Sequence, residues 1–357
     1  MKIGILGMPL TGKTTLFNLL TGQQKEVSSF STKGTKNIGV AKVHDQRIDY
    51  LSSLFHPKKT TYATIELIDI AGISPDLPSK EKSEIFSLVQ DAEALLFAIR
   101  LFEDPAVAGE KNPITQIENL RYELLLRDLE VVENRLERLA RTKRKLSHEE
   151  LSETEILKKC NEGLSEDKFL LKLDFNEDEI KKLNGFSFYT LKPIIIALNL
   201  SEEQFRADTF SGKEELKKII QENEMTSINI CGKMEMEINQ LEEEERKMFL
   251  EDLGLKESGI ERLSRVCYKY LGLISFFTVG EDEVKAWTIK KNTIAKKAAG
   301  KVHSDIERGF IRAEIVKYQH MVELGDMHKI KEKGLLKVEG KEAIIEDGDI
   351  INFRFNV

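Results

Sequence analysis

Eight residues near the N-terminus have the spacing of a phosphate-binding loop. Gly7, Gly12, Lys13 and Thr14 satisfy the pattern G-x-x-x-x-G-K-[ST], directly after the apolar run 3–6. A strand that leads through such a loop into a helix brings backbone N–H groups and the positive helix end to one anion. The sequence therefore predicts a nucleotide phosphate site formed by Pro9, Leu10, Thr11, Gly12, Lys13, Thr14 and Thr15.

Two side chains of this loop can act on a bound nucleotide. Lys13 would provide positive charge for the β- and γ-phosphates, and the Thr14 hydroxyl would bind Mg²⁺. A D-x-x-G segment, which begins at Asp69 and ends at Gly72, follows another apolar run. An Asp at the end of a buried strand can hold the water shell of Mg²⁺, and the Gly N–H can bind a γ-phosphate. We therefore predict a Mg²⁺ site at Thr14 and Asp69, with Lys13 and Gly72 as catalytic residues.

A third segment has the position of a base-recognition motif. Asn199 begins an N-x-x-E pattern at the end of an apolar run. Ordinary GTPases have N-K-x-D here; the Asp accepts two hydrogen bonds from guanine, and the Lys covers the base. Because Glu202 is one methylene longer and Leu200 replaces the Lys, we expect a weakened guanine preference, which leaves both ATP and GTP open. Three residues after the next predicted strand are expected to close the base pocket: Cys231, Gly232 and Lys233.

The elements that must position these residues follow from the pattern of apolar runs. Runs such as 94–99 and 194–196 are almost continuously apolar, which indicates parallel strands buried on both faces of a sheet. Strands that alternate with helices predict an α/β fold, here a doubly wound, mostly parallel P-loop domain. The predicted strands in the first 275 residues are 2–6, 38–43, 63–70, 94–99, 194–198 and 227–230.

Between about residues 113 and 192 this alternation stops. Apolar residues recur at three- and four-residue steps over 117–139, which predicts an amphipathic helix, and a second helix at 149–163 can return antiparallel to it. The tip of this hairpin is either a solvated helix end, whose cations complement the helix dipole, or a prong that faces RNA. It carries six cations within eleven residues: Arg135, Arg138, Arg141, Lys143, Arg144 and Lys145.

From about residue 274 the pattern changes to α+β. Strands are predicted at 274–279, 283–289, 310–316, 335–339 and 350–355, with one helix at 293–307. This order suggests a small ubiquitin-like module that binds a partner. The predicted domains are therefore a P-loop domain at 1–113 and 191–273, a helical insertion at 114–190, and the α+β module at 274–357.

The composition limits the class of protein. A chain of 357 residues is expected to form two or three domains. A net charge of −7 argues against a general coat of nucleic acid, although a local basic patch remains compatible. The three cysteines lie far apart, so neither a disulfide framework nor a zinc site is predicted. Without a signal peptide or an apolar stretch of ~18 residues, we expect a cytoplasmic monomer with no membrane partner.

With these motifs the chain resembles the YchF subfamily of Obg-related P-loop NTPases, of the TRAFAC class. The resemblance rests on 7–14, 69–72, 199–202 and 233–235, and on C-terminal blocks similar to a TGS domain at 276–280, 284–289, 298–303, 309–314 and 347–349. It implies a P-loop domain with a coiled-coil insertion and a TGS domain. It also implies that ATP binds at least as well as GTP, that hydrolysis is slow, and that the protein associates with ribosomes.

The chain departs from that subfamily near the phosphate site. Members usually have P-N-V where this chain has Pro9-Leu10-Thr11, a change that backbone binding should tolerate. Ile73 follows Gly72, where ordinary GTPases have a Gln that orients the attacking water. Phe97 stands where members often carry a His. We therefore expect turnover to be very slow or to depend on a partner.

Two functions fit these observations. The first is a slow ATP/GTP hydrolase that acts as a switch on ribosomes or RNA, and an intact Lys13, Thr14 and Asp69 favour it. The second is a regulator that binds RNA or protein under nucleotide control without hydrolysis, which the replaced water-orienting positions favour. A threonine that contacts Mg²⁺ from the first switch is also expected, and Thr32 and Thr35 both fit.

Overall fold

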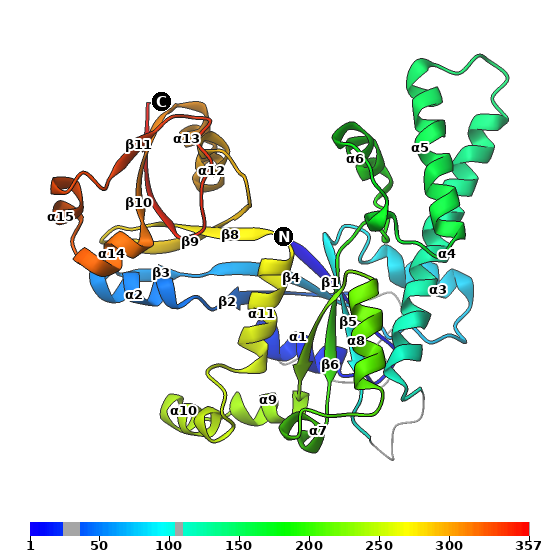
Figure 1. Ribbon diagram of the computed structural model, residues 1–357, viewed down its shortest axis with the longest axis horizontal. Helices are drawn as coiled ribbons and strands as arrows, with labels where there is room; N and C mark the ends of the chain where they lie inside the picture. The colour runs from blue at the N-terminus through cyan, green and yellow to red at the C-terminus, as the bar shows by residue number, and fades with distance from the viewer. Residues whose placement is uncertain (24–35, 104–109, 357) are drawn as a thin grey trace. The chain divides into compact units, whose positions relative to one another are not determined.

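The computed structural model describes residues 1–23, 36–103 and 110–356 (Figure 1). The chain forms two compact units. The first contains Met1–Gly39 and Glu66–Ile260, and the second contains Val40–Ile65 and Glu261–Val357. The candidate threonines Thr32 and Thr35 lie outside the described residues.

The sheet of the first unit has the strand order β2-β4-β1-β5-β6-β7. Strand β1 pairs in parallel with β4 and β5, and β6 pairs in parallel with β5 and β7. Every residue of β5 is buried, as expected for a sheet covered on both faces. The predicted α/β fold and its six strands are confirmed, with these bounds: β1 Lys2–Leu6, β2 Asn37–Val43, β4 Ala63–Asp69, β5 Ala94–Arg100, β6 Ile194–Asn199 and β7 Thr226–Ile230.

Helices follow the strands of this sheet. The first, α1, continues the loop after β1, and α3 follows the segment after β4. Helix α11 runs across the division between the two units. Apart from the insertion, the helices are α1 Lys13–Thr21, α3 Ser79–Ser87, α7 Glu202–Arg206, α8 Lys213–Glu222, α9 Gly232–Ile238, α10 Glu243–Asp252 and α11 Gly259–Tyr270.

The insertion between β5 and β6 begins with two long helices, α4 (Pro113–Ala140) and α5 (His148–Ser165), which lie side by side (Figure 1). Asn112 caps the start of α4, and Ser147 and Glu150 form a capping box at the start of α5. Buried side chains of both helices join the core cluster of the unit. Three short helices complete the insertion: η1 Leu170–Lys172, α6 Glu177–Leu183 and η2 Asn184–Phe186.

The second unit is a sheet with the order β11-β10-β12-β8-β9-β3 and five helices. The predicted single helix at 293–307 is wrong, because His303 is extended and its Nδ1 accepts the N–H of Asp305, which starts a new helix. The elements are α2 Gln46–Phe55, β3 Lys59–Thr61, β8 Leu273–Thr278, β9 Glu283–Lys290, α12 Ala295–Val302, α13 Ser304–Arg308, β10 Phe310–Lys317, α14 Tyr318–Leu324, α15 Met327–Glu332, β11 Lys337–Glu339 and β12 Asp349–Phe355.

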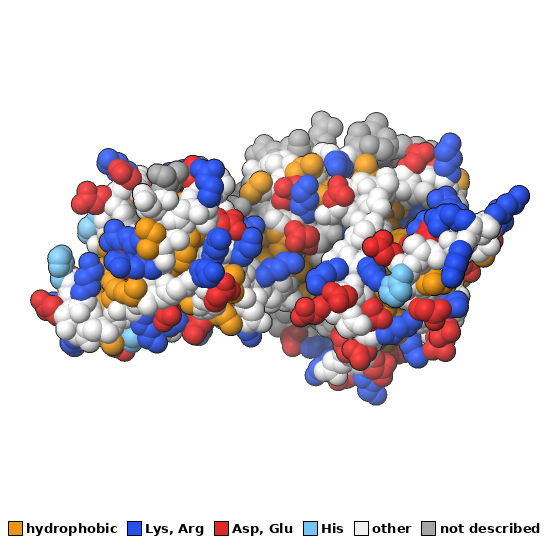
Figure 2. All heavy atoms as spheres, turned by 90° about the horizontal axis from the view of Figure 1, so that it is seen from above, with side chains coloured by type: hydrophobic (Ala, Val, Ile, Leu, Met, Phe, Trp, Pro, Cys, Tyr) orange, Lys and Arg blue, Asp and Glu red, His pale blue; other side chains and the backbone are white. Residues whose placement is uncertain are grey.

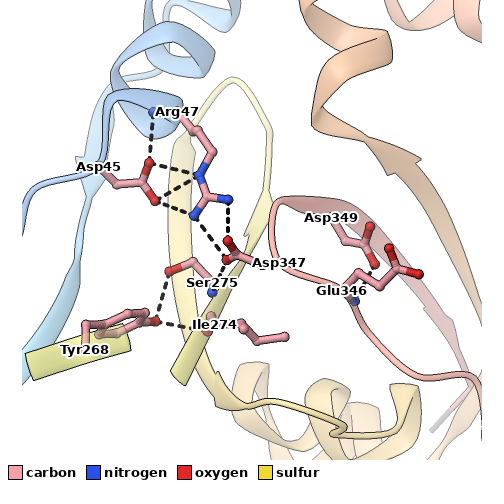
Figure 3. Close-up of polar contacts among 8 residues, drawn as sticks. All are labelled: Asp45, Arg47, Tyr268, Ile274, Ser275, Glu346, Asp347 and Asp349. Carbon is pink, nitrogen blue, oxygen red and sulfur yellow. Dashed lines mark hydrogen bonds and ion pairs between the residues drawn. The ribbon is translucent and has the colours of Figure 1, made fainter. Parts of the chain in front are cut away.

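Residues 40–65 pack with the C-terminal residues, although the sequence predicts them in the P-loop domain. The Arg47 guanidinium bonds the carboxylates of Asp45 at 2.8 Å and Asp347 at 2.9 Å (Figure 3). Asp347 also accepts the N–H of Ser275 at 2.9 Å, and β3 pairs in parallel with β9. The compact units therefore do not follow the predicted domain bounds at this segment, and the other bounds stay a prediction.

Candidate nucleotide site

The phosphate-binding loop joins β1 to α1. Gly12 caps α1 with a φ of 89°, a left-handed conformation that favours glycine. A Cβ atom on Gly12 would lie 2.4 Å from the Asn199 Nδ2, so close approach also requires glycine. Leu10 has a φ of 62° and is 39% exposed, whereas Thr11 is buried. Pro9 lies against Gly72, and Thr15 is partly buried in the first turn of α1.

Lys13 is buried at the start of α1. Its Nζ donates to the carbonyl of Met8 at 2.7 Å, inside the loop. Burial lowers the pKa of Lys13 to about 8, and the charge of Asp69 partly opposes this shift. The Lys13 ammonium therefore bonds a backbone carbonyl and is attracted by the charge of the Asp69 carboxylate. A buried positive charge in these surroundings suits a group that binds phosphate.

Thr14 and Asp69 lie together at the carboxyl ends of β1 and β4. The Thr14 hydroxyl donates to the Asp69 Oδ2 at 3.1 Å, and the Asn37 Nδ2 donates to the same oxygen at 3.4 Å. The Asp69 Oδ1 is buried and has no hydrogen-bond partner among the described residues. Burial raises the pKa of Asp69, while hydrogen bonds from Asn37 and Thr14 lower it. A hydroxyl and a carboxylate with a free buried oxygen fit Mg²⁺, which prefers oxygen ligands.

Gly72 closes the phosphate end of the site. A Cβ atom on Gly72 would lie 2.6 Å from the Pro9 nitrogen and 3.1 Å from the Lys13 Nζ, so the D-x-x-G turn packs directly on the loop. The next N–H, that of Ile73, donates to the Gly7 carbonyl at 3.0 Å. The Ile73 and Phe97 side chains are buried in the core cluster, so neither faces a bound water.

Asn199 links the phosphate loop to the base-side loop. Its Nδ2 donates to the Thr11 carbonyl at 3.2 Å, and its Oδ1 accepts the N–H of Gly232 at 3.0 Å. Cys231 is buried, and burial raises the pKa of its thiol. Lys233 is exposed. The structure therefore brings Asn199, Gly232 and the phosphate loop together.

Leu200 and Glu202 lie differently from what the N-K-x-D comparison suggests. Leu200 is 2% exposed and belongs to the core cluster, so its side chain does not cover a base as a Lys would. Glu202 begins α7, after the cap Ser201, and pairs with Arg206 at 3.1 Å. Its side chain is 44% exposed. The structure does not bring either side chain into contact with Asn199.

Sequence reasoning missed three polar residues of this region. Asn37, which bonds Asp69, immediately precedes a predicted strand. Arg100 is 2% exposed, is the register partner of Asn199, and has a buried Nη2 without a partner among the described residues. Gln116 bonds both the N–H and the carbonyl of Arg100, at 3.0 and 2.8 Å. For Arg100, the available sequence signal was a charged residue directly after the apolar run 94–99.

Three of the six cations at the tip of the hairpin form ion pairs with glutamates. Arg135, Arg141 and Arg144 pair with Glu153, Glu137 and Glu150 at 2.7, 3.0 and 2.6 Å. Within the described ranges, the exposed Arg138, Lys143 and Lys145 side chains have no ion pair. Figure 2 shows Lys and Arg side chains gathered at this end of the hairpin beside acidic ones.

Two features of other protein classes are absent from the described part of the chain. No group of three or more His, Cys, Asp and Glu side chains there is arranged to hold a metal ion. No described helix has both the length and the apolar character needed to cross a bilayer.

Comparisons with known proteins agree with this geometry. A family model described as a 50S ribosome-binding GTPase matches residues 2–135, and a YchF-type GTPase C-terminal model, described as a protein of unknown function, matches residues 273–356. "Ribosome-binding ATPase YchF" of Bacillus subtilis is 40% identical over 99% of both chains. The same-named protein of Escherichia coli O157:H7 is 34% identical over 100% of this chain and 99% of its own.

A solved structure extends the similarity to three dimensions. The YchF GTPase of Schizosaccharomyces pombe superimposes with a TM-score of 0.87 and 29% sequence identity, over 99% of this chain and 97% of the other. The similarity therefore extends over almost the whole length of this chain and of these relatives. The chain belongs to the YchF family of P-loop NTPases.

Proposed function

We propose that this protein is a nucleotide-dependent switch on ribosomes, which binds ATP and/or GTP with Mg²⁺ and hydrolyses it slowly. One observation carries the proposal: a buried Lys13, the Thr14–Asp69 pair and Gly72 meet at one edge of the sheet. Each of these groups complements a different part of a nucleoside triphosphate. The names of the relatives supply the ribosome and the ATPase activity.

The roles of these residues follow from their chemistry. Lys13 neutralises charge on the β- and γ-phosphates, and the Gly12 and Gly72 N–H groups bind phosphate oxygens. Thr14 and Asp69 would hold Mg²⁺, and a metal ion bound there would supply positive charge near the phosphates. Water then attacks the γ-phosphorus in line with the leaving oxygen and yields a nucleoside diphosphate and phosphate. On the base side, Asn199 holds the phosphate loop against Gly232. Pro9, Leu10, Thr11 and Thr15 would contact the phosphates, and Cys231 and Lys233 would lie beside the base. Leu200 and Glu202 would influence base choice only through the backbone that follows Asn199.

The proposal includes how the protein engages its partner. RNA of the ribosome would meet the unpaired cations at the hairpin tip, Arg138, Lys143 and Lys145, because free cations release counterions from RNA on binding. The TGS-like module of the second unit would provide a second contact. We also propose a monomer in the cytoplasm, where it would meet the ribosomes that the names of the relatives give as their partner.

A second function is favoured by one specific observation. Ile73 is 3% exposed and Phe97 is fully buried, both in an apolar cluster. Neither can orient a water, so the protein would hold its nucleotide and regulate RNA or protein binding without hydrolysis. The γ-phosphate would then act only by ordering the segment after Gly72.

Binding and turnover, measured on the full chain, separate the two functions. ATP and GTP are titrated with Mg²⁺ by calorimetry, and phosphate release is followed with and without ribosomes, with Lys13→Ala as the control. Tight binding with slow release that Lys13→Ala abolishes supports the hydrolase. Tight binding without release, even with ribosomes, supports the regulator. Equal binding by wild type and Lys13→Ala would refute both.

A further inference from the structure

The segment that carries Gly72 continues without interruption into α3, which contacts the base of the hairpin. Ile73 is buried, Leu77 is partly buried against the same core, and α3 starts at Ser79. Six residues, 73–78, thus separate Gly72 from the helix. Ile73 is anchored by its side chain in the core and by its N–H to the Gly7 carbonyl, so this short link packs on the same core as α3.

Helix α4 holds α3 through charged side chains that are mostly buried. Lys82 of α3 forms an ion pair with Glu123 of α4, and the two side chains are 11% and 17% exposed. Arg127, one turn further along α4, lies 3.7 Å from the Glu123 carboxylate and donates to the Ser83 hydroxyl at 2.9 Å. Because these charges are shielded from water, removal of one partner would leave the other buried and unpaired, which is far more costly than breaking a surface pair.

An aromatic contact holds the last turn of α3. The Arg127 guanidinium lies 4.3 Å from the centre of the Phe86 ring. Tyr189, at the return end of the insertion, packs edge-on against the same ring at 5.6 Å, and its hydroxyl donates to the Phe86 carbonyl at 2.9 Å. Phe86 is therefore held between the outgoing and the returning segment of the insertion.

The returning segment is itself fixed to α4. Asp128, the residue after Arg127, accepts the N–H groups of Tyr189 and Thr190 at 3.0 and 2.7 Å, and the Thr190 hydroxyl at 2.7 Å. Lys192 donates to the Gln90 carbonyl, just beyond α3. The side chains of α3, α4 and residues 189–192 thus form one connected set of contacts. Figure 1 shows α3 beside α4 at the base of the hairpin.

We propose that Glu123 and Arg127 are positioning residues for the nucleotide reaction: through α3 they fix Gly72, so that the hairpin and the phosphate site control each other. The inference rests on the proposed function and adds the route by which a ribosome on the hairpin changes hydrolysis. A shift of about 1 Å in a group that binds the reacting phosphate can change a rate by about 100-fold. By linkage, a γ-phosphate that moves Gly72 must also change the affinity of the hairpin for its partner.

The test uses the full chain and two near-isosteric variants, Glu123→Gln and Arg127→Met. The matched control is Arg135→Met, which breaks an Arg–Glu pair of the same hairpin that does not touch α3. Hydrogen exchange of residues 113–127 is compared with and without a non-hydrolysable ATP analogue and Mg²⁺. Phosphate release is measured with and without ribosomes.

We expect nucleotide binding to change these exchange rates at least threefold in the wild type and in Arg135→Met, and less than 1.5-fold in the two variants. Ribosome stimulation of release should fall at least fivefold in the variants, while ATP affinity stays within twofold. Arg127→Lys, which keeps the charge but loses the planar contact with Phe86, should be intermediate.

Three outcomes overturn the proposal. The first is a wild type that binds the analogue without any change in exchange at 113–127. The second is folded variants that respond as the wild type does, and the third is a control variant that loses its response equally. Failure of the proposed function is recognised separately, because the wild type would then not bind ATP or GTP at all.

Discussion

Two carboxylates of the first unit are almost completely buried, and their surroundings differ. Asp69 is 3% exposed and Asp128 is 1% exposed. Burial raises the pKa of both, that of Asp128 to about 6. The oxygens of Asp128 accept three hydrogen bonds, whereas the Asp69 Oδ1 accepts none from a described residue.

This difference separates a structural carboxylate from one that binds a ligand. Asp128 uses its charge to hold residues 189 and 190 against α4, so its hydrogen bonds are complete without a partner. Asp69 keeps a buried oxygen that no described residue satisfies, at a cost in desolvation that a bound cation would offset. Burial and a raised pKa are common to both carboxylates, so the hydrogen bonds of their oxygens are what distinguish them.

The largest expected effect comes from substitution of Asp69, the carboxylate that we assign to ligand binding. Asp69→Asn should weaken the Mg²⁺ dependence of nucleotide binding and lower phosphate release by about 100- to 1000-fold, because a neutral amide stabilises a cation poorly. The melting temperature should not fall, since the substitution removes a buried charge. Calorimetry at several Mg²⁺ concentrations, phosphate release and a thermal melt measure this. Unchanged Mg²⁺ dependence would mean that Asp69 is not a metal ligand.

The counterpart substitution should act on stability. In Asp128→Asn an amide group must face either the Thr190 N–H or the Tyr189 N–H, and one donor is left unpaired. We expect a loss of about 1–3 kcal/mol in the free energy of unfolding. Urea titration measures it, with the exposed Asp178→Asn as the control. A loss below about 0.5 kcal/mol would contradict the structural role.

The same contrast explains what the sequence could predict. The phosphate loop, the D-x-x-G turn and the strands depend on local patterns, and the structure confirms the predicted strands and fold. Asp128 lies on the amphipathic helix of 117–139 as one polar residue among many, and its donors are 61 and 62 residues away in sequence. Leu200 looked like a base contact because motif position alone does not reveal which face of a strand end is buried.

Other differences arise from contacts distant in sequence. Residues 40–65 have an ordinary α/β pattern, and contacts with residues more than 200 positions away, such as the Arg47–Asp347 ion pair and the β3–β9 pairing, place them in the second unit. The break at His303 depends on one side chain that caps a new turn in an otherwise helical run. Neither signal is visible in the periodicity of a single sequence.

The pH dependence of nucleotide affinity tests Lys13, the buried cation of the ligand site. The pKa of Lys13 is about 8 in the folded protein against 10.5 for an ordinary Lys. Bound phosphates keep the ammonium protonated, so above pH 8 binding requires uptake of a proton. Nucleotide affinity should then fall by up to about tenfold per pH unit from pH 8 to 10. Calorimetry measures it, and Lys13→Arg, which stays charged, should lose this dependence.

Stability without nucleotide should change in the opposite direction. Because the folded-state pKa of Lys13 lies below the unfolded value, the unfolded chain binds more protons between pH 8 and 10.5. The contribution of Lys13 to the free energy of unfolding therefore rises with pH over this window. If wild type and Lys13→Arg showed the same pH profiles in both measurements, the ammonium would not be buried as the structure has it.

The smallest effect extends the comparison from the core to the surface, where the hairpin tip has three paired and three unpaired cations. We assume that an unpaired charged group marks a ligand site here too. Replacing Arg138, Lys143 and Lys145 with Ser should then lower the slope of log affinity against log salt for ribosome binding by about 2. Replacing Arg135, Arg141 and Arg144 removes the same charge, but each already neutralises a carboxylate of the hairpin. That triple variant should change the slope by less than half as much.

Co-sedimentation with ribosomes over a salt series measures both slopes. Equal slopes for the two variants would show that pairing in the free protein does not select the binding residues. A slope unchanged in both would make the tip a solvated helix end, because cations that contact RNA must release counterions.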